Sequence, residues 1–466
     1  MVYDVFISYG RKESRTFVKE LHDRLVAEGL VVWLDQNDIP LGVDFQEQIN
    51  DGILRSHSFL FVIAPHSINS IYCSREIELA EKYNKRIVPL LHVLPESAEQ
   101  ENEIRSSIRR INWTPFVDES QFESSFSDLL SILQKQRAYV EKHTEMLLRA
   151  SLWREGKYEK SLLLLGEDRA LAETWLDTPF TYEQAPCQPT ELQCRYISES
   201  KKNATNLHTD VYFVYAESAG SQMNEISFAF TRHNMSCWIA QFDLRTGIAE
   251  DTQRQNGIEN ADNIVLVWTE DMRNNALRMA EFEYAVSLNK RIIGISLSGV
   301  SLSQDATFQN IQFTPWASAN VMGIIAEIQT ERSYFQKHTQ VLVAALKWER
   351  QNYNQSILFR GYNLVQTEDW LRIASKQQSS PPTELQYKFI KESLAKGDSL
   401  PTEVFISYSR SESDFARHLN TELQIHAKNT WFDQESIAPG SAFEQEINNG
   451  IRNSDNFLFV ISERSV

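Results

Sequence analysis

An internal repeat constrains the fold of this chain more than any other feature of its sequence. The hexapeptide Asp4–Tyr9 returns in altered form as Asp210–Tyr215 and again as Glu403–Tyr408. Each hexapeptide is an apolar run of strand length that is rich in β-forming residues. Self-similarity at long, regular intervals is typical of repeated structural units, so we expect three copies of one domain.

Within the first copy, apolar runs of strand length alternate with helical patterns. Strands are predicted over residues 3–9, 30–34, 59–64 and 87–91. The helix after the first strand ends at Gly29 and places four apolar residues on one face, namely Phe17, Leu21, Leu25 and Val26. Further helices are predicted through Phe45–Ile53 and from about Ser70. Strands that alternate with helices indicate an α/β fold, with a parallel sheet covered on both faces.

The segments between the copies repeat as well. His143–Thr144, Trp153 and Pro189–Gln193 of the first segment recur as His338–Thr339, Trp348 and Pro382–Gln386 of the second. Apolar residues at helical spacing predict a helical hairpin and a trailing helix in each segment. We therefore divide the chain into a complete domain (1–136), a helical connector (137–205), a second domain (206–332), a second helical connector (333–400) and a truncated third domain (401–466).

The third copy stops at Val466, which is level with Ile68 of the first copy. A sheet cut after its third strand would leave an apolar edge open. We expect either that the chain is a fragment of a longer polypeptide, which we favour, or that a partner completes the last domain.

Charge and composition exclude several classes of function. Sixty-three acidic residues against 46 basic residues give a net charge of −17, which repels nucleic-acid phosphates, so we expect no nucleic-acid partner. No run of 18 apolar residues and no secretory leader is present, so we expect no membrane association. The four scattered cysteines fit no zinc spacing and predict reduced thiols in a cytoplasmic protein without a metal or a cofactor.

Three motifs of the first copy together carry a family resemblance. They are the strand Asp4–Tyr9, the loop Asp38–Gly42 and the helix start Ser70–Glu76. In order and spacing they resemble box 1, the BB loop and the Ser-x-Trp-Cys-x-x-Glu helix of the TIR (Toll/interleukin-1 receptor) domain, with Tyr72 where Trp is common. The resemblance implies repeated flavodoxin-like domains, each a five-stranded parallel sheet with helices on both faces, joined by α-helical connectors as in large prokaryotic signalling proteins.

TIR domains are of two functional kinds, and the resemblance does not choose between them. Some are scaffolds that bind other TIR domains, and others cleave NAD+ at the nicotinamide–ribose bond and in some cases cyclise the product. Loss of nicotinamide develops positive charge on the ribose, which a nearby carboxylate stabilises. The resemblance implies that Glu76 is the catalytic glutamate, near the carboxyl ends of the strands where parallel sheets bind ligands. The alternative is a surface glutamate favoured near a helix N-terminus.

Other residues of the first copy are candidates for binding NAD+ as the substrate. Tyr72 lies one turn before Glu76 and could stack on a base, or it could simply pack against a loop. Arg11 could pair with the pyrophosphate, or it could be a solvated surface arginine. The remaining substrate-binding candidates follow or end strands, and Trp33 among them could instead be a core residue: Ser8, Tyr9, Trp33 and Asp35.

The loop after the second predicted strand is the candidate gating and interface segment. In the family this loop covers the pocket and makes TIR–TIR contacts, and the residues that correspond to it here are Asp38, Ile39, Pro40 and Gly42. Gly42 also has a simpler explanation as a turn residue with positive φ.

The second copy keeps a glutamate at the matching position, Glu281, but its surroundings differ. Ser8 becomes Val214, Arg11 becomes Glu217, Tyr72 becomes Leu277, Cys73 becomes Arg278 and Asp35 becomes Ala240. A negative charge in place of Arg11 would repel a pyrophosphate. We therefore expect the second domain to be a structural TIR domain with impaired catalysis.

The favoured hypothesis is NAD+ cleavage by the first domain, as an NAD+ glycohydrolase or an ADP-ribose cyclase in a prokaryotic defence or stress pathway. The other copies would scaffold TIR–TIR self-association by raising the local concentration of TIR domains to about the mM range. The alternative is a non-enzymatic interaction scaffold in which all three copies serve docking. A nucleotide-sensing role has less support because no basic pocket is evident.

Overall fold

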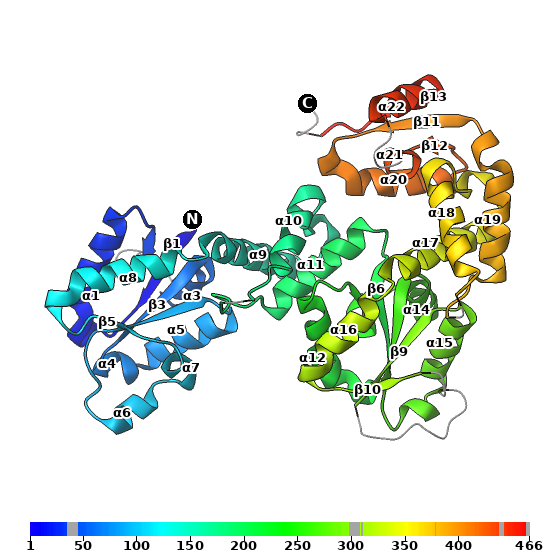
Figure 1. Ribbon diagram of the computed structural model, residues 1–466. Helices are drawn as coiled ribbons and strands as arrows, with labels where there is room; N and C mark the ends of the chain where they lie inside the picture. Colours follow the sequence, from blue (N-terminus) through cyan, green and yellow to red (C-terminus); the bar gives the residue numbers. More distant parts are fainter. Residues whose placement is uncertain are drawn as a thin grey trace. The chain divides into compact units, whose positions relative to one another are not determined.

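The computed structural model describes residues 1–34, 45–181, 183–297, 308, 311–377, 379–437 and 442–462. Five of the predicted site residues lie outside these ranges, namely Asp35, Asp38, Ile39, Pro40 and Gly42. The chain divides into two compact units (Figure 1). One unit holds Met1–Leu162 and Ala172–Tyr196, and the other holds Leu163–Leu171 and Ile197–Val466.

The first unit is built on a five-stranded sheet in which all neighbouring strands are parallel. The strands lie in the order β2-β1-β3-β4-β5. Their bounds are β1 Tyr3–Ser8, β2 Val32–Trp33, β3 Ser56–Ile63, β4 Arg86–Leu91 and β5 Thr114–Pro115. Strand β2 is shorter than predicted, because this edge strand pairs with β1 only at Val32 and Trp33.

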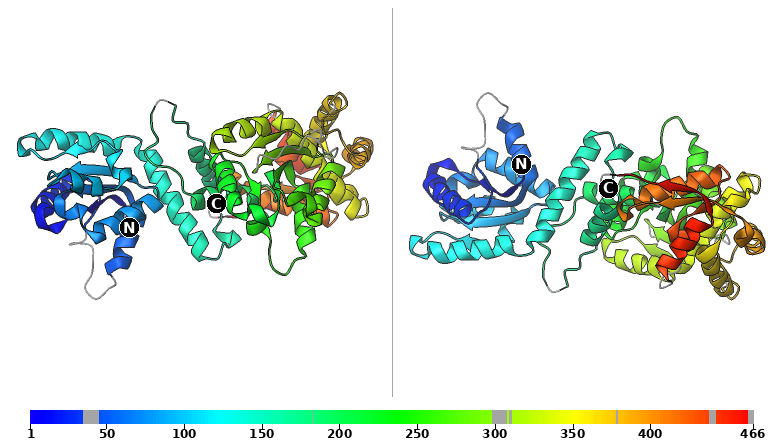
Figure 2. Two further views of the ribbon diagram at one scale, coloured as in Figure 1. Left: turned by 90° about the horizontal axis from the view of Figure 1, so that it is seen from below. Right: turned by 90° about the horizontal axis from the view of Figure 1, so that it is seen from above.

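Helices cover both faces of this sheet (Figure 2). Helices α1 (Arg11–Ala27) and α8 (Phe122–Gln134) share one hydrophobic cluster with alternate residues of β1, and α3 (Phe45–Arg55) and α5 (Ile71–Lys82) share the other. Short helices complete the domain: α4 Pro65–Ile68, α6 Ala98–Glu103, α7 Ser106–Arg109 and η1 Glu119–Gln121.

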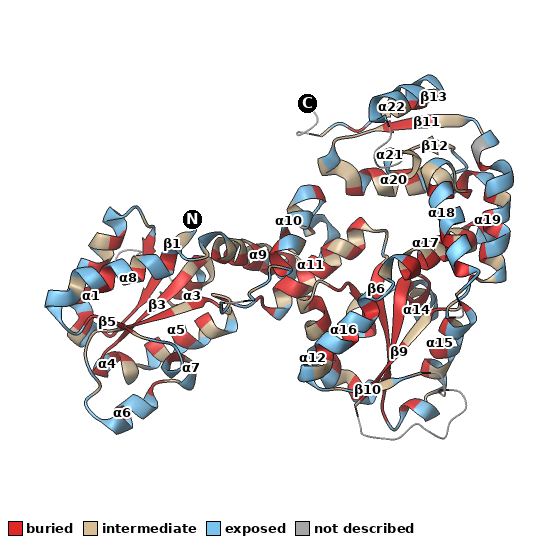
Figure 3. Cartoon of the chain, viewed as in Figure 1, coloured by how far each residue is buried: buried red, intermediate tan, exposed pale blue. Residues whose placement is uncertain are grey.

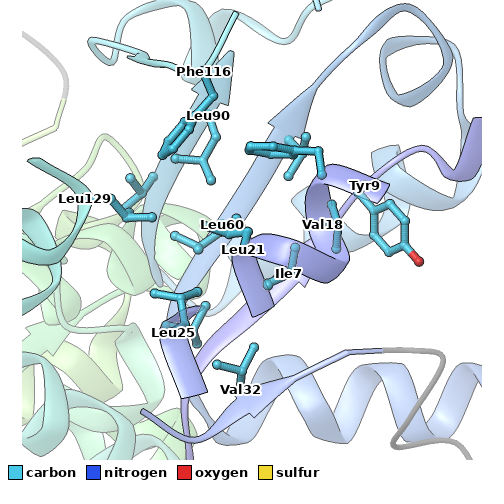
Figure 4. Packing of buried hydrophobic residues seen from close by; sticks show 14 of the residues in the cluster. Ile7, Tyr9, Val18, Leu21, Leu25, Val32, Leu60, Leu90, Phe116 and Leu129 are labelled. Atoms are coloured by element: carbon cyan, nitrogen blue, oxygen red, sulfur yellow. The ribbon is translucent and has the colours of Figure 1, made fainter. Parts of the chain in front are cut away.

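The predicted apolar stripe of α1 is mostly correct. Phe17, Leu21 and Leu25 are buried against the sheet, whereas Val26 is 47% exposed. Figure 4 shows Leu21 and Leu25 packed together with Ile7 of β1 and Leu129 of α8. Because side chains alternate along a strand, Ile7 lies in this cluster while its neighbour Phe6 lies in the cluster on the other face.

The first connector is helical, as predicted, with α9 Arg137–Glu155, η2 Lys160–Leu162, α10 Gly166–Leu176 and α11 Glu191–Ala204. Helix α9 packs on β3 and α3 of its own sheet. At this contact the buried Lys85 side chain donates to Leu54 O at 2.8 Å, to Ser56 O at 2.7 Å and to Thr144 Oγ1 of α9 at 3.4 Å. We call this group of contacts the lysine latch.

The second unit repeats this architecture. Its complete sheet has the parallel order β10-β9-β8-β6-β7, formed by β6 Thr209–Tyr215, β7 Cys237–Trp238, β8 Ala261–Trp268, β9 Arg291–Ser296 and β10 Phe313–Pro315. Strands β6 and β8 are almost entirely buried (Figure 3). The surrounding helices are η3 Glu217–Ala219, α12 Gly220–Arg232, α13 Ala240–Asp243, α14 Glu250–Glu259, η4 Met272–Asn274, α15 Ala276–Ser287, η6 Ser318–Asn320 and α16 Val321–Gln329.

The second connector has the same order of helices as the first and makes the same kind of polar contacts with its sheet. It contains α17 Arg332–Arg350, η7 Gln355–Ile357, α18 Gly361–Ala374, α19 Glu384–Lys396 and η8 Gly397–Ser399. Lys290 forms the second lysine latch, with bonds to Glu259 O at 2.8 Å, Ala261 O at 2.7 Å and Thr339 Oγ1 at 3.1 Å. Thr144 and Thr339 of the recurring motifs therefore help to attach each connector to its own sheet, whereas the recurring Trp153 and Trp348 pack within the connectors.

The third copy has a three-stranded parallel sheet in the order β12-β11-β13. Its elements are β11 Thr402–Ser407, η9 Arg410–Glu412, α20 Ser413–Ile425, β12 Thr430–Trp431, α21 Asp433–Ser436, α22 Phe443–Arg452 and β13 Ser454–Phe459. Phe405 stacks on Trp431 at 4.4 Å between ring centres, as Phe6 stacks on Trp33 at 4.3 Å in the first copy.

The predicted fold class is thus confirmed: repeated α/β domains with parallel sheets, five-stranded in the first two copies, are joined by helical connectors. Among the described residues, no helix combines the length and the apolarity that a membrane crossing needs. All four cysteine side chains are buried.

Candidate functional site

The candidate site lies where the end of β1 meets α5. Helix α5 begins after Ser70, whose Oγ accepts a hydrogen bond from Cys73 N at 3.3 Å and so caps the helix. Cys73 and Ile77 face the core and fix the rotation of the helix. Glu76 therefore lies at the edge of the buried face and is half-buried.

A short hydrogen bond joins two of the predicted site residues. Ser8 is the last residue of β1, is 1% exposed, and donates from Oγ to Glu76 Oε2 at 2.6 Å. A hydrogen bond to an ionised carboxylate is shorter and stronger than one between neutral groups. The fold thus brings together Ser8 and Glu76, which are 68 positions apart in the sequence.

Tyr72 and Arg11 lie on the surface. Tyr72 is 57% exposed in the first turn of α5, four positions before Glu76. Arg11 is the exposed first residue of α1, three positions after Ser8. An exposed aromatic ring and an exposed guanidinium could contact a base and a phosphate, and these roles stay predictions.

Tyr9 and Trp33 lie in two different cores. Tyr9 is 8% exposed and belongs to the cluster on the α1 face (Figure 4), because successive strand residues point to opposite faces and Ser8 points to the α5 face. Trp33 is 2% exposed and stacks on Phe6, within the cluster of the α5 face. Their predicted contacts with the substrate stay predictions, but both side chains pack against core residues in this structure.

Two residues of the third copy, Tyr408 and Asp433, show one contact that this pair of positions can make. Tyr408 and Asp433 match Tyr9 and Asp35. Tyr408 OH donates to Asp433 Oδ1 at 2.5 Å, and this bond ties the end of β11 to the start of α21. In that copy the pair has a structural role.

Two histidines that sequence reasoning did not single out lie near the carboxyl ends of the strands. His66 lies in α4 after β3 and is exposed. It lies close to Gly10, since a Cβ atom at that position would be 3.0 Å from His66 Nδ1. His92 follows β4, lies 3.0 Å from Ser14 Oγ and stacks on Phe17, and burial lowers its pKa. Their positions directly after buried strands were the signal that could have found them.

The matching glutamate of the second copy is enclosed by cations. Glu281 is 6% exposed and forms ion pairs with the buried side chains of Arg278 and Arg254, the latter at 3.2 Å. Tyr212 OH also donates to Glu281 Oε2, at 3.2 Å. Burial raises the pKa of Glu281, although the two arginines act in the opposite direction. Arg278 and Arg254 replace Cys73 and Ile49 of the first copy, so this carboxylate is bound by the protein itself.

A cluster of possible metal ligands lies elsewhere, at the amino end of the first sheet. Asp4, His57 and Glu141 offer ligand atoms within 4.8 Å of one another. Arg137 of α9 bonds to both carboxylates, at 3.0 Å from Asp4 and 2.7 Å from Glu141. A cation would have to displace this guanidinium, so we assign no metal to the cluster.

Comparisons with known proteins bear on the family. The chain is 29% identical to the NAD(+) hydrolase TcpA of Theionarchaea archaeon (strain DG-70-1) over 94 residues, which are 19% of this chain and 29% of that protein. It is 28% identical to the 2' cyclic ADP-D-ribose synthase AbTIR of Acinetobacter baumannii (strain 1295743) over 94 residues, 19% of this chain and 35% of that protein. The alignments thus span well under half the length of these relatives.

The comparisons also include a solved structure and a family model. The TIR domain of the Toll-related receptor TRR-2 from Hydra magnipapillata is 21% identical, covers 28% of this chain and 99% of its own, and has a TM-score of 0.25. The family model described as the TIR domain matches residues 5–130, 211–324 and 404–466, which together exceed half of the chain. The chain therefore belongs to the TIR domain family.

Proposed function

We propose that the first TIR domain cleaves NAD+ at the nicotinamide–ribose bond, with Glu76 as the catalytic carboxylate. The observation that carries the proposal is the half-buried carboxylate of Glu76, held by Ser8 at the carboxyl edge of a parallel sheet. Relatives named as an NAD(+) hydrolase and as a 2' cyclic ADP-D-ribose synthase support this chemistry.

In the proposed reaction the C–N bond to nicotinamide breaks and its electron pair leaves with the neutral nicotinamide. The ribose then carries positive charge, which the Glu76 carboxylate stabilises. Attack by water gives ADP-ribose and a proton, and attack by a hydroxyl of the same ADP-ribose would give a cyclic product. Tyr72 would contact a base, and Arg11 the pyrophosphate.

The second TIR domain has a different proposed role. Its Glu281 is 6% exposed and ion-paired with two arginines, which supports docking rather than catalysis for this copy. We propose that the second and third copies promote TIR–TIR self-association around the first, in a cytoplasmic protein of a prokaryotic defence or stress pathway.

The test is nicotinamide release from NAD+ by the full chain, measured by chromatography, in solution and clustered on beads. Glu76→Gln should lower the rate by about 100-fold or more, since it removes the charge that stabilises the transition state. Glu281→Gln should leave the rate within about twofold of the wild type, because only the first domain is proposed to react.

A matched control is Glu78→Gln, on the same helix, where an exposed carboxylate binds Arg105 at 2.9 Å. This variant should keep the wild-type rate. No turnover by any form, even clustered, would contradict the enzyme and favour a non-enzymatic TIR–TIR scaffold. A rate per chain that does not rise with protein concentration or with clustering would contradict the role of self-association.

A further inference from the structure

Ser8 lies too deep to reach a ligand and yet touches the candidate catalytic group. Its side chain is 1% exposed, and its hydroxyl hydrogen is directed at Glu76 Oε2 over 2.6 Å. A hydroxyl has one hydrogen to donate, so a hydroxyl that binds the glutamate does not donate to a substrate as well. We therefore propose that Ser8 is a positioning residue that acts through Glu76, rather than a substrate-binding residue. This inference rests on the proposed function of the first domain.

The support beneath Ser8 is rigid. Strand β1 lies between β2 and β3, and Ser8 is paired in register with Phe61 of β3. Two residues earlier, Phe6 stacks on Trp33 at 4.3 Å and on Phe59 at 5.4 Å, on the same face of the sheet as Ser8. A central strand with this packing holds the hydroxyl in place, whereas Glu76 has a long side chain with several rotatable bonds. The hydrogen bond from Ser8 therefore restrains the position of the Glu76 carboxylate relative to the sheet.

The second copy offers an internal comparison. There the position of Ser8 is taken by Val214, which cannot donate a hydrogen bond, and Glu281 is held instead by Arg254, Arg278 and Tyr212. These partners neutralise the carboxylate and enclose it. The Ser8 hydroxyl is a neutral donor, so its hydrogen bond restrains Glu76 without placing a positive charge beside the carboxylate. The serine is therefore the kind of partner that a carboxylate needs if it is to face a positively charged transition state.

The test compares steady-state kinetics of NAD+ cleavage by the full chain with Ser8→Ala, which removes the hydroxyl, and Ser8→Thr, which keeps it. We expect Ser8→Ala to lower kcat by about 10- to 100-fold with KM changed less than threefold, because the carboxylate is misplaced and not lost. Ser8→Thr should restore most of kcat. The matched control is Ser125→Ala in α8, which removes a hydroxyl from a residue with 3% exposure on a helix of the other face of the sheet and should keep kcat.

Three kinetic results would overturn the proposal. A higher KM with unchanged kcat would make Ser8 a substrate-binding residue. Equal losses in Ser8→Ala, Ser8→Thr and Ser125→Ala would mean a general packing effect. Unchanged kinetics in Ser8→Ala would mean that the contact has no role in the reaction.

A second measurement does not depend on activity. Melting temperatures of Ser8→Ala, Glu76→Gln and the double variant form a cycle, and two residues in contact should give a combined shift that differs from the sum of the separate shifts. Additive shifts would overturn the proposal even in an active enzyme. If the wild type releases no nicotinamide while the shifts are coupled, the proposed function fails and the contact between Ser8 and Glu76 stands.

Discussion

The lysine latch predicts that the first long helix of each connector, α9 or α17, belongs to the folded unit of the preceding TIR domain. The perturbation is Lys85→Met, which keeps a long apolar side chain but removes the ammonium. Ser56 O retains a contact with Thr144 Oγ1 at 3.3 Å, whereas Leu54 O, in the last turn of α3, loses its bond to Lys85. A buried carbonyl without a hydrogen-bond partner costs about 1–3 kcal/mol in the folded state. The variant also loses the hydrogen bonds of the ammonium, but it no longer has to bury a charged group, and this offsets part of the loss. We expect a net loss of about 2 kcal/mol in the stability of this contact.

The assay is hydrogen exchange of the full chain at pH 6, read by mass spectrometry on peptides from α3, β3 and α9. A loss of about 2 kcal/mol corresponds to about 30-fold faster exchange through the opening of this region. Lys82→Met, an exposed lysine near the end of α5, is the matched control and should change nothing. Lys290→Met should produce the same acceleration in α17 and β8. Unchanged exchange in α9, or an equal effect of Lys82→Met, would mean that the latch does not hold α9 against the sheet.

Three further predictions concern stability. Burial lowers the pKa of Lys85 to about 7, against an ordinary value of 10.5, so above pH 7 the unfolded chain binds more protons than the folded chain. The free energy of unfolding should therefore rise by about 1.4 kcal/mol per pH unit from pH 7 to 9. Denaturant unfolding should show a smaller slope in Lys85→Met. Gly52→Ala should cost about 1–3 kcal/mol in urea unfolding, because its new Cβ would lie 2.7 Å from the Trp33 ring, and an unchanged midpoint would contradict this packing. Arg278→Ala should cost about 3 kcal/mol in the second domain, since it leaves Glu281 with a weaker set of buried partners, and hydrogen exchange in α15 should report the loss.

Much of the fold could be predicted from periodicity and repetition. Alternating strands and helices predicted the parallel sheet, and the spacing of Phe17, Leu21 and Leu25 predicted the buried face of α1. The extent of β2 was overestimated because the length of an edge strand depends on its single neighbour. Val26 was placed on the buried face although it is exposed, since one helical face cannot hold both Leu25 and its neighbour.

The candidate site was predictable in its members and less so in its contacts. Glu76 and Ser8 stand in separate motifs, and only the pairing of β1 with β3 and the packing of α5 bring them to 2.6 Å. The period of two along a strand could already have separated Tyr9 from Ser8, because consecutive residues face opposite sides. Arg254 could not be found in this way, since it reaches Glu281 from α14, a helix of a different motif.

The lysine latch also bears on where a stable fragment of the chain can end. The family match to the first TIR domain ends at residue 130, before α9, although Lys85 bonds to Thr144 within that helix. A fragment that stops at residue 130 would expose the Lys85 ammonium to solvent. It would also leave the carbonyl oxygens of Leu54 and Ser56 without the cover of α9. The folding unit that the latch defines is therefore larger than the region that the TIR family model matches. A fragment that is to keep the complete latch of the first domain must therefore extend through Thr144.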